Sequence, residues 1–189
     1  MKSGIATVVF GLFVGIAQGQ VNSPSSGKAS SLEVLARQPG AYVTWSKEVG
    51  HLESGESNAV VTALVVEDSA QRGQRMRGVR IDLWRPDWKS TLYVEESLLQ
   101  PLKTAFDQLT LDIERDLFSN GTGMGFIGSC VFRNNPHVYP LEADYYYSGP
   151  NSPALRVFGP KREQIMFPGL MPSDLSKLLG SAIDELKAQ

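Results

Sequence analysis

The sequence predicts an α+β fold, in which one or two antiparallel sheets of about eight strands in total pack with two long helices on a single side. Three observations predict this class. Short apolar or alternating segments typical of strands occupy much of residues 41–94, and an amphipathic segment follows at 95–117. The same order, strands and then a helix, recurs over residues 126–187.

The N-terminal residues indicate an exported protein. Lys2 is followed by an uncharged apolar run at 5–17, and Ala17-Gln18-Gly19 matches the small-x-small pattern after which signal peptidase cuts. The run is shorter than the ~20 residues that a membrane-spanning helix needs, so no stable span is expected after processing. Polar, low-complexity sequence follows at once, which disfavours the alternative of a buried N-terminal helix. The expected organisation is a signal peptide at 1–19, a disordered leader at 20–31 and a single domain at 32–189.

Charge and cysteine content narrow the expected partners. Without residues 1–19 the chain carries a net charge of −3, which gives no global attraction to nucleic acid. Cys130 is the only cysteine, so the domain forms no internal disulfide, and no cysteine near Gly19 offers a lipid anchor. We therefore expect a periplasmic or secreted protein whose partner is a protein or glycan of the envelope or extracellular space.

The first half of the domain reads as a short helix followed by strands. Residues 31–36 predict a helix that ends before the turn signal Gln38-Pro39-Gly40. Strands are predicted at 41–46, 59–66, 78–84 and 91–94. The second is apolar enough to be buried on both faces, and in the third apolar and charged residues alternate. Arg85-Pro86-Asp87 predicts the turn between the last two strands.

A helix is predicted at about 95–117, with an apolar stripe at three- and four-residue steps. Pro101 is costly inside a helix, so we expect it in or near the first turn, and Ser119-Asn120-Gly121 should end the helix. The second half predicts strands at 126–132, 143–148, 154–158 and 164–167, and a helix at 173–187.

The two halves, 41–118 and 124–187, resemble each other in sequence. Residues 102–109 align with 179–186 at four identities, and residues 79–81 align with 155–157 at nearly the same offset. One hypothesis is a duplicated unit of four strands and a helix. The alternative is that two amphipathic helices following hairpins look alike without common origin.

Motifs for catalysis, cofactors and metals are weak. The Gly123–Gly128 segment matches G-x-G-x-x-G, but it follows a helix and precedes a strand, the reverse of the dinucleotide-binding order, so no cofactor is expected. No histidine pair has zinc-like spacing, and no metal is expected. Cys130 with His51 or His137 forms the one candidate thiol–imidazole pair, which keeps an exported hydrolase or thiol enzyme as an alternative function.

Arginine and aromatic residues provide the candidate binding residues, and no catalytic residue is assigned. Arginines cluster around a predicted loop, either as a patch for an anionic partner or as a solvated hairpin. Trp84 and Trp88 flank the predicted turn, either as a contact surface or as a cross-strand pair that closes the hairpin. The candidates are Trp84, Arg85, Trp88, Arg72, Arg75, Arg77 and Tyr146, the last from a run of three tyrosines.

The function predicted from these observations is a non-catalytic, exported binding or interaction module whose ligand is a protein, a glycan or a small apolar molecule. The surface expected to bind is the Trp84–Trp88 hairpin with the arginines. The exported enzyme and a structural component of the envelope are the alternatives.

Overall fold

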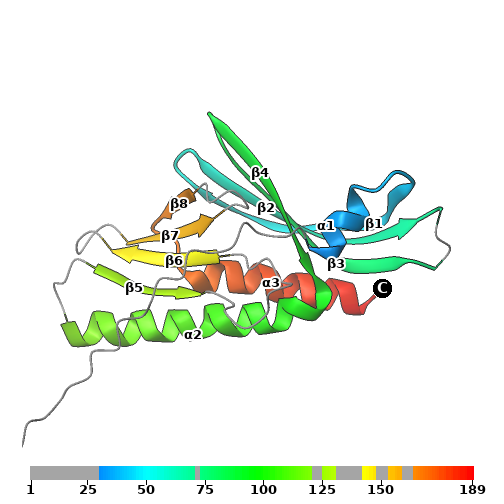
Figure 1. The fold of residues 1–189 in the computed structure, drawn as a ribbon. Helices are drawn as coiled ribbons and strands as arrows, with labels where there is room; N and C mark the ends of the chain where they lie inside the picture. Colours follow the sequence, from blue (N-terminus) through cyan, green and yellow to red (C-terminus); the bar gives the residue numbers. More distant parts are fainter. Residues whose placement is uncertain (1–29, 71–72, 121–124, 131–141, 148–152, 159–163) are drawn as a thin grey trace, which may run out of the picture.

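The computed structural model describes residues 30–70, 73–120, 125–130, 142–147, 153–158 and 164–189. Within these residues the chain forms eight strands and three helices, so the α+β class and the antiparallel pairing are confirmed. The strands form two four-stranded antiparallel sheets, and each sheet is followed along the chain by a long helix (Figure 1). No helix in the described part of the chain is long and apolar enough to cross a membrane.

The first sheet has the order β1-β2-β3-β4, in which every strand pairs with its neighbour in sequence. Its strands are β1 (Ala41–Ser54), β2 (Ser57–Asp68), β3 (Arg75–Arg85) and β4 (Trp88–Glu95). β1 is eight residues longer than its prediction. Half of the additional residues are exposed, because β1 lies at the sheet edge, and a register shift between Glu48 and Gly50 interrupts their alternation.

β2 lies between β1 and β3, and its residues 61–66 are buried on both faces, as its apolar run predicts. Side chains alternate between an inner face, which joins the main core, and an outer face. Val61, Ala63 and Val65 are inner-face residues, whereas Leu64 and Val66 belong to a separate small cluster on the outer face.

That outer cluster is covered by α1 (Ser31–Ala36). Ser30 caps the helix by accepting a hydrogen bond from the Glu33 amide, so the ordered domain already includes Ser30 and Ser31, just before its expected start. Leu32 and Leu35 are fully buried against the sheet. Gly78 of β3 allows this approach, since a Cβ there would lie 2.6 Å from Leu32 Cδ2.

The main core lies on the inner face, where α2 (Glu96–Asn120) and α3 (Pro172–Lys187) pack side by side (Figure 1). Most of the predicted stripe of α2 is buried, with Leu98 and Ala105 partly buried against the same core, and the helix ends at Asn120 as expected. The expected position of Pro101 is wrong, because it is the sixth residue of a continuous helix. The turn before it is held in place by the fully buried Leu99 and by an ion pair of Glu96.

The second sheet has the order β5-β6-β7-β8 and lies over α2 and α3 in Figure 1. Its strands are β5 (Gly125–Cys130), β6 (Glu142–Tyr147), β7 (Pro153–Phe158) and β8 (Gln164–Pro168). Leu155, Val157, Ile165 and Phe167 enter the same core as the first sheet. Ser54 at the end of β1 donates a hydrogen bond to the Pro168 carbonyl, which ties the two sheets together.

Candidate functional site

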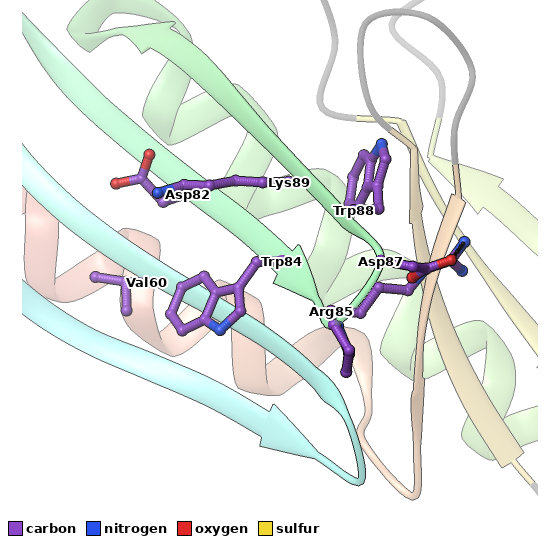
Figure 2. A pocket seen from close by; sticks show the side chains of 8 residues that line it. Val60, Asp82, Trp84, Arg85, Asp87, Trp88 and Lys89 are labelled. Atoms are coloured by element: carbon purple, nitrogen blue, oxygen red, sulfur yellow. Dashed lines mark hydrogen bonds and ion pairs between the residues drawn. The ribbon is translucent and has the colours of Figure 1, made fainter.

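A shallow hollow of about 690 Å³ lies at the tip of the β3–β4 hairpin (Figure 2). Only Pro86 and Asp87 separate the two strands, so the hairpin forms at the turn that the sequence predicts. The residues that line the hollow are Val60, Asp82, Trp84, Arg85, Pro86, Asp87, Trp88 and Lys89. The volume falls in the range of small-molecule sites, which is roughly 300–1,000 Å³.

The strand register places the two tryptophans on opposite faces of the sheet. Trp84 lies opposite Lys89, and Trp88 lies opposite Arg85, so the cross-strand tryptophan pair considered from the sequence is wrong. Trp88 packs against the main core. Trp84 is partly exposed on the outer face, and Figure 2 shows its indole beside Val60. The same figure shows Trp88 on the other side of β4.

The two carboxylates of the hollow, Asp82 and Asp87, accept hydrogen bonds from neighbouring side chains. Asp82 accepts a 2.9 Å hydrogen bond from Arg80 Nε and a 2.7 Å hydrogen bond from the Thr91 hydroxyl. Arg85 donates to both carboxylate oxygens of Asp87, at 2.6 and 3.3 Å. Both carboxylates are therefore oriented and partly neutralised.

Several lining residues were not identified from the sequence, namely Val60, Asp82, Pro86, Asp87 and Lys89. The alternation of β3 contained a signal for one of them. Asp82 and Trp84 are two residues apart in a strand, so they must share a face. Val60 depends on the pairing of β2 with β3, which the residue pattern alone does not specify.

Of the predicted arginines, Arg85 lines this hollow, whereas Arg75 and Arg77 do not. Arg77 donates to both oxygens of Glu96, at 2.7 and 2.6 Å, and to the carbonyl of Leu186, at 3.1 Å. It therefore connects the start of α2 to the end of α3. Arg75 contacts Glu67 at 3.5 Å.

The distance along β3 explains this separation. Arg77 and Trp84 are seven positions apart in one strand, which corresponds to ~23 Å. Arg72 lies outside the described residues. The predicted arginines that the structure describes thus divide into Arg85 at the hollow and the pair Arg75 and Arg77 toward the other end of the strand.

The remaining candidates belong to other parts of the fold. Tyr146 is in β6 of the second sheet, where its backbone pairs with Phe126 and Ala154. Cys130 is the last residue of β5, also in the second sheet, whereas His51 is exposed on β1 of the first. His137 lies outside the described residues. Among the residues that the structure does describe, no three His, Cys, Asp or Glu side chains are grouped to hold a metal ion.

A polar cluster at the α2–α3 contact contains the most strongly perturbed carboxylate in the described ranges. Hydrogen bonds from Lys103 and then Ser176 hold the pKa of Asp107 below its usual value, against a smaller opposing effect of burial. Ser176 is only 2% exposed, so its hydroxyl is not presented to a substrate. This cluster is a structural contact between the helices.

Comparison with known proteins identifies no relative. No family model matches the chain, and no curated protein and no solved structure is significantly similar to it. The functional argument therefore rests on the residues of the hollow.

Proposed function

We propose that this protein is an exported, non-catalytic binding module whose ligand occupies the hollow at the β3–β4 hairpin. The observation that carries the proposal is the position of Trp84. This large aromatic side chain is partly exposed on the outer face, which it shares with Asp82, whose carboxylate is oriented by hydrogen bonds from Arg80 and Thr91. Such aromatic side chains combine a large apolar area with a polar tip, which suits a contact surface.

The arrangement of the outer face supports binding over a purely structural role. α1 covers the part of the face formed by Leu64 and Val66, where apolar side chains would otherwise be exposed. Around Trp84 no such cover is present among the described residues. Trp88, by contrast, already supplies an aromatic contact to the core from the same hairpin.

Export is the second part of the proposal, and the sequence of residues 1–19 supports it. Expression of the full chain in a secreting bacterial host tests it directly. We expect N-terminal sequencing of the exported protein to begin at Gln20. Retention of Met1 in a cytosolic product would contradict export without affecting the binding proposal.

Binding is tested with the purified exported protein immobilised on a sensor surface. Protein fractions and polysaccharide fractions of the source envelope are passed over it separately. We expect retention from one class of fraction, and loss of that retention in Trp84→Ala. Tyr42→Ala is the matched control, because Tyr42 is 50% exposed and lies toward the other end of the same sheet.

Two results would overturn the binding proposal. One is the absence of any retained component. The other is equal retention by wild type and Trp84→Ala, with both proteins shown to be folded by circular dichroism.

We also propose that the two halves of the domain arose by duplication. Each sheet has its strands in sequence order and precedes a helix. The aligned segments 79–81 and 155–157 occupy the third strand of each sheet, and in both the outer two residues are buried and the central arginine is half-buried. Superposition of the halves in an experimental structure should match residues at offsets of 76–77, and a different best offset would contradict common origin.

A further inference from the structure

We infer that the ligand of the hollow is a neutral saccharide that stacks on Trp84. The inference rests on the proposed binding function and assigns the chemical class of the ligand. Three features of the hollow carry it: a partly exposed aromatic ring on the outer face of the sheet, charges that largely cancel, and polar groups at the edge of that ring.

The aromatic face comes first. In Figure 2 the indole of Trp84 lies beside Val60, and Asp82 and Lys89 extend along the same face of the sheet. The face of an aromatic ring is electronegative, so it attracts partially positive C–H groups. One side of a pyranose ring presents C–H groups in this way, whereas its hydroxyl groups point outward from the rim.

The polar groups fit those hydroxyls. Asp82 receives one hydrogen bond on each carboxylate oxygen, and a carboxylate has about four lone-pair sites, so it keeps capacity to accept from a ligand hydroxyl. Lys89 supplies donors, and no ion pair to it occurs within the described residues. The site therefore offers acceptors and donors around an apolar platform, which is the pattern of a sugar-binding surface.

The charges around the hollow nearly cancel, because two carboxylates lie among three cationic groups, so the site gives little attraction to a strongly charged ligand. Asp82 and Asp87 would repel an anion, whereas Arg80, Arg85 and Lys89 would repel a cation. Both carboxylates are already paired with arginine, at 2.9 and 2.6 Å. A neutral ligand loses none of these ion pairs on binding.

A protein partner is less favoured by the same surface. Specific protein interfaces bury about 800 Å² per partner around a core of several aromatic or apolar anchors. The apolar groups of the hollow are few: Trp84 and Val60 on this face, with Pro86 and part of Trp88 at the hairpin tip. One ring with a polar rim matches one or two sugar residues better.

The test is a titration of the purified exported protein with an array of neutral oligosaccharides of glucose, galactose, mannose and N-acetylglucosamine, with oligogalacturonate as an anionic comparison. Binding is measured by isothermal calorimetry and by quenching of tryptophan fluorescence. We expect saturable binding of at least one neutral member, and no binding of oligogalacturonate.

Variants connect the binding to the hollow. Trp84→Ala should raise Kd by about tenfold or more, whereas Trp84→Tyr, which keeps an aromatic face, should change it by less than about threefold. Asp82→Asn should weaken binding at nearly unchanged shape. Tyr42→Ala should bind as the wild type does, and thermal melting confirms that each variant is folded.

The outcomes are separable from those of the binding proposal. No saturable binding of any neutral oligosaccharide up to about 10 mM overturns the saccharide inference, since weaker binding would carry little free energy. If a protein fraction is nevertheless retained in a Trp84-dependent manner, the binding function stands and its ligand is a protein. Saccharide binding that Trp84→Ala leaves unchanged also overturns the inference.

Discussion

Replacement of Arg77 by glutamine tests whether this arginine stabilises the fold, as its contacts in the structure indicate. The alternative, suggested by the sequence pattern, is that it binds an anionic partner. The side chain connects three elements. It makes a two-point ion pair with Glu96 in the first turn of α2 and donates to the carbonyl of Leu186 in the last turn of α3. The negative charge of Glu96 lies at the N-terminus of α2, and the positive charge of Arg77 lies at the C-terminus of α3, so each is favoured by the dipole of that helix.

The magnitude follows from these contacts. The side chains of Arg77 and Glu96 are 33% and 34% exposed, so solvent screening limits the ion pair to about 1 kcal/mol despite its two-point geometry. The hydrogen bond to the helix-terminal carbonyl adds about 1 kcal/mol. Arg77→Gln should therefore lower the free energy of unfolding by about 2 kcal/mol, which corresponds to roughly 4–8 °C in Tm for a domain of this size.

Urea denaturation followed by circular dichroism measures the effect, and Arg75→Gln is the matched control. Arg75 belongs to the same strand, is half-exposed and reaches Glu67 only at 3.5 Å, so its replacement should change stability by less than about 0.5 kcal/mol. A double-mutant cycle with Glu96→Gln should give a coupling energy of about 1 kcal/mol between Arg77 and Glu96. High salt should reduce that coupling.

Two results would refute this reasoning. If Arg77→Gln unfolds at the same urea concentration as the wild type, the contacts with Glu96 and Leu186 contribute nothing to stability. If Arg75→Gln is equally destabilising, the effect comes from lost positive charge in this region, without the specific geometry of Arg77.

Three further predictions concern the helices, each measured as stability against urea or heat. Leu32→Ala should cost about 2–4 kcal/mol because Leu32 of α1 is fully buried against the sheet. Val34→Ala, at a side chain of the same helix that is 48% exposed, should change stability by less than about 0.5 kcal/mol. Equal effects would show that α1 is not docked. Pro101→Ala should raise stability by about 1 kcal/mol, since it restores a backbone donor inside α2, and a fall in Tm would contradict this. Asp107→Asn should lower stability by about 0.5 kcal/mol at neutral pH. The folded-state pKa of Asp107 is lowered, so its contribution to stability is present above the unfolded pKa of about 3.9 and is lost as pH falls through the folded pKa. The stabilities of wild type and Asp107→Asn should therefore converge in acid. A constant difference in stability down to that pH would contradict the assignment.

Local patterns in the sequence predicted much of the fold. The alternation of β3, the apolar run of β2 and the stripes of α2 and α3 each depend on neighbours only a few positions away, so the residues report them directly. The role of Arg77 was not accessible in this way. Its partners are 19 and 109 positions distant in the chain, and no periodicity indicates such pairs.

The register at the hairpin shows how one residue changes a functional interpretation. A three-residue turn at Arg85-Pro86-Asp87 would set Trp84 opposite Trp88 and make a closing aromatic pair. The observed loop contains only Pro86 and Asp87, so Arg85 pairs with Trp88 and Trp84 pairs with Lys89. Because neighbouring positions in a strand face opposite ways, this shift separates the tryptophans onto the two faces of the sheet.

That separation leaves Trp84 as the tryptophan of the hairpin on the outer face of the sheet. Trp88 is used by the core, and the arginines at the other end of β3 are used by the helices and by Glu67. Trp84, by contrast, belongs to neither of the two apolar clusters of the described residues, and α1 covers the outer face only around Leu64. The proposed saccharide would use this ring as its apolar contact and Asp82, which two hydrogen bonds orient, as its acceptor, so Trp84→Ala and Asp82→Asn should both weaken binding.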